Sequence, residues 1–338
     1  MRLAAAITLA MVALVSTNDR GRAEGVGFTH LVAETRPGGF QRIAVWFPNA
    51  DGAPSQWRVG SQIMHVTAAD DLTPGRHGLV VIVHAVATTA LSHSDTAIAL
   101  AGNGYIVAAP VISDDGGHGV DADAGRHILR RIETARVAID ALVSDATFSP
   151  HIDATRIGII GHGHGGAAVL ALLGSRPQRL GPVRHCRQFP KDVICKAEGV
   201  SSIGAASDER IDGTPDPRIR AAFVMSPTPL WYRGEQLQGM RHPLTVVVAE
   251  KDEVIKDQGA ARRLATATRD VSFSVVPNAG HYAFVTPPSA INKDVSAAVL
   301  ADPYGFDRRA YLKSLGRDVV AFFGAALMRS TPSHHQRQ

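Results

Sequence analysis

Short apolar runs alternate with helical patterns along most of the chain. The run 78–84 (GLVVIVH) is continuous, as expected for a strand buried on both faces, and residues 41–47 alternate enough to form an earlier strand. Further strands are predicted at 105–109, 156–160, 221–225, 244–249 and 271–276. Helices are predicted at 94–103, 125–143, from about 165, at 258–268 and at 307–327. This alternation predicts an α/β fold with a doubly wound, mostly parallel sheet.

The first 23 residues follow a different pattern. Met1 and Arg2 precede an apolar run from Leu3 to Val15, which is followed by polar residues and a small-residue site ending at Ala23. This order is typical of a secretory signal peptide, and the run is shorter than the roughly 20 residues of a spanning helix. We therefore expect a periplasmic or secreted protein without stable membrane insertion. An uncleaved anchor is the alternative.

Residues 24–329 are predicted to form one domain, and 330–338 a polar, disordered tail. The interval 175–216 breaks the strand–helix rhythm and is predicted to be a lid insertion over the carboxyl edge of the sheet. The two cysteines of the chain, Cys186 and Cys195, both lie in it. In an oxidising compartment they are expected to form a disulfide, with two free thiols or half of a metal site as alternatives.

Composition narrows the function classes. With 45% hydrophobic residues in 338, the chain can bury one large core. Lys and Arg number 35 against 31 Asp and Glu, and the basic residues are dispersed along the chain. Since nucleic-acid binding usually needs a basic face, we do not expect a nucleic-acid partner.

The most informative segment is 156–173, RIGIIGHGHGGAAVLALL, which predicts a strand, a tight glycine turn and a helix. One interpretation is dinucleotide binding, because Gly161, Gly163 and Gly166 satisfy G-x-G-x-x-G. This fingerprint also needs a following strand that ends in Asp or Glu. About 20 residues further on, the sequence looks like a loop instead. A second interpretation is a metal held by His162 and His164, although no carboxylate nearby completes the ligand set.

The third interpretation is a nucleophile elbow, G-x-S-x-G, in which small flanking residues permit a strained turn. Gly161 and Gly165 are then the flanking residues, and Gly163 occupies the position of the nucleophile. Two later residues support this interpretation, because Asp252 follows the strand 244–249 and His281 follows the strand 271–276. Nucleophile, acid and histidine thus occur in the chain order of one catalytic constellation.

On these motifs the mature chain resembles the predicted dienelactone hydrolases, an α/β-hydrolase group related to platelet-activating-factor acetylhydrolases. Besides the elbow, the matching stretches are 26–28, 45–48, 80–86, 104–110, 278–284, 305–309 and 322–323. The resemblance implies the α/β-hydrolase fold with a lid, and an oxyanion hole made by the backbone N–H groups of Val86 and His164. This chain departs from the family at Gly163, where the serine is missing, at Ala85, where a glycine is usual, and in lacking C-terminal cysteines.

A site without the serine oxygen excludes covalent acyl-enzyme chemistry at residue 163. Two functions then remain open: a pseudoenzyme that binds an ester, carboxylate or lipid-like ligand or a protein partner, and slow hydrolysis by water that His281 and Asp252 activate. Hydrolysis by a metal-bound water at His162 and His164 is a further alternative. The expected ligand is a small ester or carboxylate, and no cofactor or metal is expected.

Overall fold

The computed structural model describes most of the chain outside its two ends. The described residues are 25–35, 38–49, 53–67, 71–112, 126–178, 180–192, 195, 215–232, 240, 242–255, 262, 271–289 and 297–328. The predicted signal peptide, the tail 330–338, nearly all of the predicted helix 258–268 and much of the insertion lie outside this part. Within it, no helix is long and apolar enough to cross a membrane.

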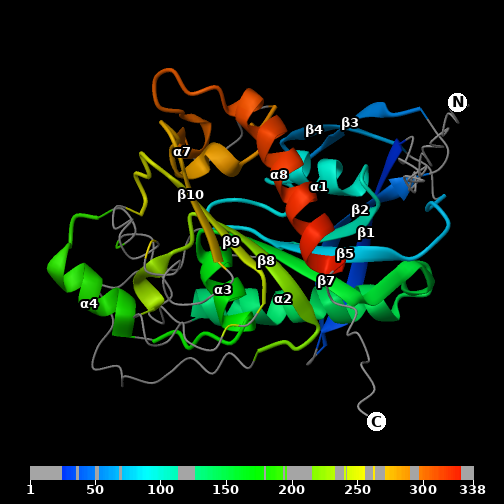
Figure 1. Cartoon of the computed structure of the whole chain (residues 1–338), viewed down its shortest axis with the longest axis horizontal. Helices are drawn as coiled ribbons and strands as arrows, with labels where there is room; N and C mark the ends of the chain where they lie inside the picture. Colours follow the sequence, from blue (N-terminus) through cyan, green and yellow to red (C-terminus); the bar gives the residue numbers. More distant parts are fainter. Residues whose placement is uncertain are drawn as a thin grey trace, which may run out of the picture.

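An eight-stranded sheet forms the centre of the molecule (Figure 1), in the order β1-β2-β6-β5-β7-β8-β9-β10. The strands are β1 (Gly25–Thr35), β2 (Gly39–Asn49), β5 (His77–Val83), β6 (Tyr105–Pro110), β7 (Ile152–His162), β8 (Ile219–Met225), β9 (Leu244–Ala249) and β10 (Val271–Val276). Strand β2 pairs antiparallel with β1 and with β6, and the other neighbours pair in parallel. The predicted mostly parallel sheet is confirmed.

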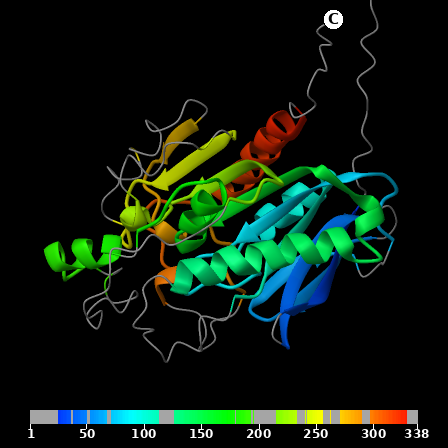
Figure 2. The same cartoon turned by 90° about the horizontal axis from the view of Figure 1, so that it is seen from below.

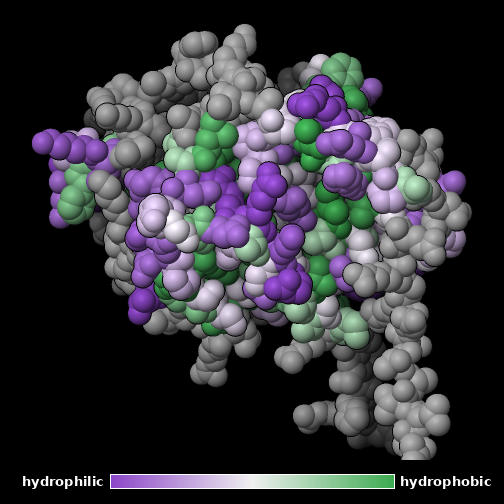
Figure 3. Space-filling view, turned by 90° about the horizontal axis from the view of Figure 1, so that it is seen from above, coloured by the Kyte–Doolittle hydropathy of each residue, from purple (hydrophilic) through white to green (hydrophobic). Residues whose placement is uncertain are grey.

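Helices cover both faces of the sheet (Figures 1 and 2). Helices α2 (Arg126–Ser144) and α3 (His164–Leu172) cover one face, and α1 (Ser94–Ala101) and α8 (Arg308–Met328) the other. On the α1 and α8 side, hydrophilic and hydrophobic side chains lie next to one another at the surface (Figure 3).

The buried strands explain why the sequence shows continuous apolar runs. In β5, Leu79 and Val81 belong to the core under α2 and α3, whereas Val80 and Ile82 belong to the core under α1 and α8. A strand covered on both faces needs apolar residues at every position, since successive side chains point to opposite faces.

Several elements were not predicted from the sequence. These are the strand β1, the hairpin of β3 (Ser55–Val59) and β4 (Gln62–Val66), the helices α4 (Leu180–Gln188) and α7 (Ala297–Leu300), and the short 3-10 helices η2 (Ser149–His151), η4 (Pro229–Trp231) and η6 (His281–Phe284). The hairpin turns at Gly60, whose φ of 57° suits glycine. Strand β7 is longer than predicted at both ends and runs up to His162, directly before the glycine turn.

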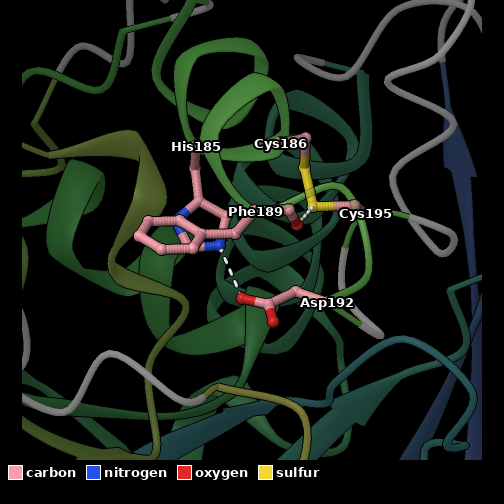
Figure 4. Close-up of a disulfide and its surroundings, with 5 residues drawn as sticks. All are labelled: His185, Cys186, Phe189, Asp192 and Cys195. Carbon is pink, nitrogen blue, oxygen red and sulfur yellow. Dashed lines mark hydrogen bonds and ion pairs between the residues drawn. A yellow bond between two sulfur atoms is a disulfide. The ribbon is translucent and has the colours of Figure 1, made fainter.

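The predicted disulfide between Cys186 and Cys195 is present, with an S–S distance of 2.02 Å. Cys186 lies in α4, where the neighbouring His185 forms a 3.0 Å contact from Nε2 to Asp192 Oδ2 (Figure 4). Both cysteines belong to a small cluster that includes Ile255, in the loop after β9. The described part of the insertion therefore packs against a segment that follows the carboxyl end of the sheet. That it acts as a lid remains a prediction.

Replacing both cysteines, Cys186→Ser with Cys195→Ser, should lower the free energy of unfolding of the protein by about 2–3 kcal/mol, because the disulfide closes a loop and so restricts the unfolded chain. The cysteines are nine residues apart. Urea unfolding with and without reductant measures the effect. Reductant should lower the stability of the unmodified protein to that of the double variant and leave the double variant unchanged. Equal stability of all four samples would contradict the prediction.

Candidate active site

The glycine turn between β7 and α3 has an uncommon backbone conformation at one residue. Gly163 has φ 55° and ψ −118°, a region that side chains with a Cβ adopt only under strain. Its N–H donates to the carbonyl of Met225 at 3.1 Å, and its carbonyl accepts from Thr228 at 3.0 Å. The turn is thus fixed to the end of β8, and it retains the conformation expected of a nucleophile elbow.

The flanking glycines are required by close backbone contacts. A Cβ on Gly161 would lie 2.6 Å from the carbonyl oxygen of Gly165, and a Cβ on Gly165 would lie 2.0 Å from the carbonyl oxygen of Val83. Neither position has room for a side chain, because backbone atoms cannot rotate away as side chains do. The spacing of small residues around residue 163 is therefore a steric requirement of this turn.

His281 and Asp252 form a buried pair. The Nδ1–H of His281 donates to Oδ2 of Asp252 at 2.8 Å, and both side chains are almost fully buried. The other carboxylate oxygen accepts the backbone N–H groups of Val254 at 3.0 Å and Ile255 at 2.6 Å. Since Asp252 engages Nδ1, the Nε2 atom of His281 is the nitrogen available to accept a proton.

Further hydrogen bonds join the loops that carry this pair. The backbone N–H groups of Glu250 and Lys251 donate to the carbonyls of Val276 and Ala279, at 3.0 and 2.8 Å. In return, the side chain of Glu250 accepts the N–H of Asn278. These contacts hold the loop after β9 and the loop after β10 in one arrangement.

Glu253 has a role that the sequence analysis missed. Its Oε2 accepts the backbone N–H of His281 at 3.0 Å, so one acidic loop holds both the ring and the main chain of this histidine. The signal was the acidic run Glu-Lys-Asp-Glu directly after β9, of which only Asp252 was singled out.

The structure brings the three predicted positions together. A Cβ built on Gly163 would lie 3.2 Å from Nε2 of His281 and 3.0 Å from the Cβ of Ala85. The imidazole nitrogen that Asp252 leaves available thus faces the place where a side chain at residue 163 would begin. The arrangement matches a catalytic triad in which the acid and the base are present and the nucleophilic atom is not.

The segment after β5 carries the predicted oxyanion donor Val86. The hydroxyl of Thr88 donates to the carbonyl of Ala85 at 2.8 Å, and Nδ1 of His84 lies 2.9 Å from the same oxygen. Ala87 has a φ of 61°, so the chain turns sharply directly after Val86. The second predicted donor, His164, is the first residue of α3, where backbone N–H groups point out of the helix end. The oxyanion-hole role of both residues remains a prediction.

Two further buried histidines, His162 and His93, lie next to one another beside His281. The ring of His162 stacks on that of His281 at 4.7 Å, its Nε2–H donates to the carbonyl of His281 at 3.0 Å, and the edge-on ring of His93 is 5.2 Å away. Burial lowers the pKa of His162 well below its usual value and the pKa of His93 to about 4. Both rings are therefore neutral at pH 7 and pack against the loop that carries His281.

These buried neutral histidines predict a loss of stability in acid. The unfolded chain binds a proton at His93 below pH 6.5, while the folded chain resists it down to about 4. Stability should therefore fall as the pH drops from 6.5 to 4, by about 2–3 kcal/mol from His93 alone. Urea unfolding at several pH values checks this, and His93→Leu should reduce the slope. An identical slope in the variant would contradict the assignment.

The other interpretations of the glycine segment fit the structure less well. His162 contacts the His281 loop, whereas His164 lies beside Thr228 and His127, so the two rings have different surroundings. In the described part of the chain no group of three or more His, Cys, Asp or Glu residues could hold a metal ion. The strand β8 next to β7 ends at Met225 and offers no acidic residue for a ribose.

Comparison with known proteins supports the resemblance. Residues 64–183 match the model of the dienelactone hydrolase family, a range that contains the elbow and ends before Asp252 and His281. No curated protein matches the sequence.

Two examples come from the many solved structures that are similar to this one. One is a ferulic acid esterase from Streptomyces cinnamoneus, with 18% identity, 93% of each chain covered and a TM-score of 0.63. The other is a dienelactone hydrolase from Anabaena variabilis, with 11% identity, 89% of this chain and 99% of that chain covered, and a TM-score of 0.49. At such identities the first likeness bears on the fold alone.

Proposed function

Because this chain has the α/β-hydrolase fold and is dienelactone hydrolase-like across its elbow, we propose that it is an esterase-like protein with a disarmed acyl-transfer site. It binds a small ester or carboxylate ligand next to His281 and forms no acyl-enzyme. The observation that carries this proposal is the position of Gly163, which holds the elbow conformation with its missing Cβ 3.2 Å from Nε2 of His281.

Loss of the serine removes most of the rate acceleration of such a site. In a triad, the serine oxygen attacks the carbonyl carbon while the histidine takes its proton, and glycine offers no side-chain atom for this attack. Removal of a triad serine lowers turnover by about 10⁶, and the remaining site retains about 10³ to 10⁴ over water through the oxyanion hole and binding. Backbone donors survive loss of a side chain, so ligand recognition can outlast the covalent chemistry.

A second candidate function rests on the preserved pair of Asp252 and His281. A water molecule near the position of the missing Cβ, which would lie 3.2 Å from Nε2 of His281, would be within reach of that nitrogen. Its oxygen would attack the ester carbonyl as Nε2 takes its proton, and the same proton would then pass to the leaving alcohol. This route gives slow hydrolysis without a covalent intermediate, because a positioned general base contributes a factor of about 10² to 10⁴.

We further propose that the protein works outside the cytoplasm. The N-terminal pattern of residues 1–23 and the disulfide of the insertion support this proposal, because disulfides persist in oxidising compartments. Fractionation of the producing cell followed by N-terminal sequencing tests it. Recovery of the full-length chain in the cytoplasm would contradict it.

The proposed function is tested with 4-nitrophenyl acetate and the unmodified protein. We expect no pre-steady-state burst, and steady turnover that is either absent or slow. If it is slow, His281→Ala should abolish it, which would favour the activated-water route over simple ligand binding. Calorimetric titration with butyrate should show binding that Gly163→Trp blocks. A stoichiometric burst would disprove the disarmed site, and the absence of any ligand binding would disprove the binding function.

A further inference from the structure

A groove of about 910 Å³ lies between α1 and α8, on the side of the sheet opposite α2 and α3. Its volume falls in the range of small-molecule sites. Its lining includes Thr286 and Pro287, a few residues after His281, and Ile63 and His65 from β4. This cavity lies apart from Gly163, Ala85 and His281, none of which lines it.

The α8 wall of the groove has two parallel rows of residues. One row is exposed and recurs every four positions: Arg309, Lys313, Arg317 and Ala321. The neighbouring row has the same spacing and consists of Leu312, Gly316 and Val320. Residues four apart on a helix share one face, so a row of cations runs beside an apolar row.

The floor of the groove is apolar, and α1 and α8 cross closely there. A Cβ on Gly316 would lie 3.0 Å from the Cβ of Ala99, so the two helices approach as far as glycine permits. Ile98 and Ala99 from α1 meet the apolar row of α8 there. From Leu312 to Val320 this floor extends over about 12 Å, at 1.5 Å per helical residue.

The charges of the groove are not balanced. Among the described residues that line the groove, Asp95 is the only carboxylate, and Arg309 is the cation whose charge acts on it. Lys313 and Arg317 form no ion pair in the described part of the chain. The groove therefore has two cations that form no ion pair with any described residue, next to a row of apolar residues.

We propose that this groove binds a monomeric anionic amphiphile, with its carboxylate at Lys313 and Arg317 and its alkyl body along the floor. Charge complementarity favours an anionic head, since Lys313 and Arg317 form no ion pair with any residue that the structure describes. The length of the floor suits an extended alkyl chain rather than a compact anion. This site is independent of the proposed function, because it uses neither the glycine turn at residue 163 nor the buried pair of Asp252 and His281.

Calorimetric titration with decanoate tests the proposal, with decan-1-ol and acetate as probes that lack the head or the chain. We expect decanoate to bind, both partial probes to bind at least about tenfold more weakly, and Lys313→Glu to weaken decanoate binding by about tenfold. Arg220→Glu is the matched control, because it makes the same change of net charge at an exposed position on β8, outside the groove.

Two comparisons separate this site from its alternatives. The decanoate binding that Lys313→Glu weakens should be unchanged in His281→Ala, whereas its loss in that variant would place this ligand in the active site and overturn the groove assignment. Equal weakening by Lys313→Glu and Arg220→Glu would show a nonspecific charge effect. Binding to phosphatidylglycerol vesicles without binding of free decanoate would assign the surface to a membrane and would also overturn the proposal.

Discussion

Gly163→Ser is expected to raise the turnover of 4-nitrophenyl acetate by at least about 10³-fold. The introduced hydroxyl would stand next to Nε2 of His281, whose ring Asp252 already orients. Since loss of a triad serine costs about 10⁶ in turnover, restoring the atom to an intact acid and base should recover a large part of that factor. The assay is steady-state hydrolysis together with a stopped-flow burst.

The substitution carries a structural cost that sets its limits. Residue 163 has a φ of 55°, where a non-glycine residue is strained by about 1–3 kcal/mol, and the new Cβ lies 3.0 Å from Ala85. Ala85 or the ring of His281 must therefore shift by a few tenths of an ångström. Ala85→Gly removes that contact and also restores the glycine usual in the family, so the double variant should be at least as active as Gly163→Ser.

Gly163→Ala is the matched control for the gain of activity. It adds the same Cβ in the same strained conformation but supplies no hydroxyl, so its turnover should stay at the level of the unmodified protein. Adding His281→Ala to Gly163→Ser should remove the gain. If Gly163→Ser folds and stays as inactive as Gly163→Ala, the geometry of the elbow does not present a nucleophile to His281.

Gly165→Ala should prevent folding or lower stability by more than about 4 kcal/mol. Its Cβ would stand 2.0 Å from the carbonyl oxygen of Val83 and 2.9 Å from that of His84, so the start of α3 could no longer pack on the end of β5. Soluble yield and urea unfolding measure the effect.

Gly324→Ala provides the control for this substitution. Gly324 lies within α8, and nothing lies within 4 Å of a Cβ built there. Alanine is the better helix former, so the variant should gain about 0.5–1 kcal/mol. A Gly165→Ala protein with near-normal stability would show that the elbow tolerates a side chain at its flank, which would contradict the packing described here.

Most of the fold was predictable because strands buried on both faces leave continuous apolar runs. The strands Leu244–Ala249 and Val271–Val276 match the predicted bounds, and α2 and α8 begin and end within a residue of the prediction. The hairpin of β3 and β4 was missed because strands of five residues at the edge of the fold give too little periodicity. The helix α4 was missed because Gly181 and Pro182 weaken its pattern.

The sequence predicted which residues form the candidate site but not which residues hold them in place. Chain order placed Gly163, Asp252 and His281 after three parallel strands, whose carboxyl ends meet at one edge of the sheet. Stacking of His162 on His281 and the contact from Glu253 to the His281 backbone depend on how loops fold over that edge. Such contacts leave no periodic trace in the sequence.

Residue 163 is the position at which a nucleophile would act, and labelling with a fluorophosphonate probe, followed by intact and peptide mass analysis, tests this assignment. The unmodified protein and Gly163→Ala should remain unlabelled, and Gly163→Ser should gain one adduct, confined to the peptide that contains the new hydroxyl. Stoichiometric labelling of the unmodified protein at another residue, or a folded Gly163→Ser protein that stays unlabelled, would show that residue 163 is not the nucleophile position.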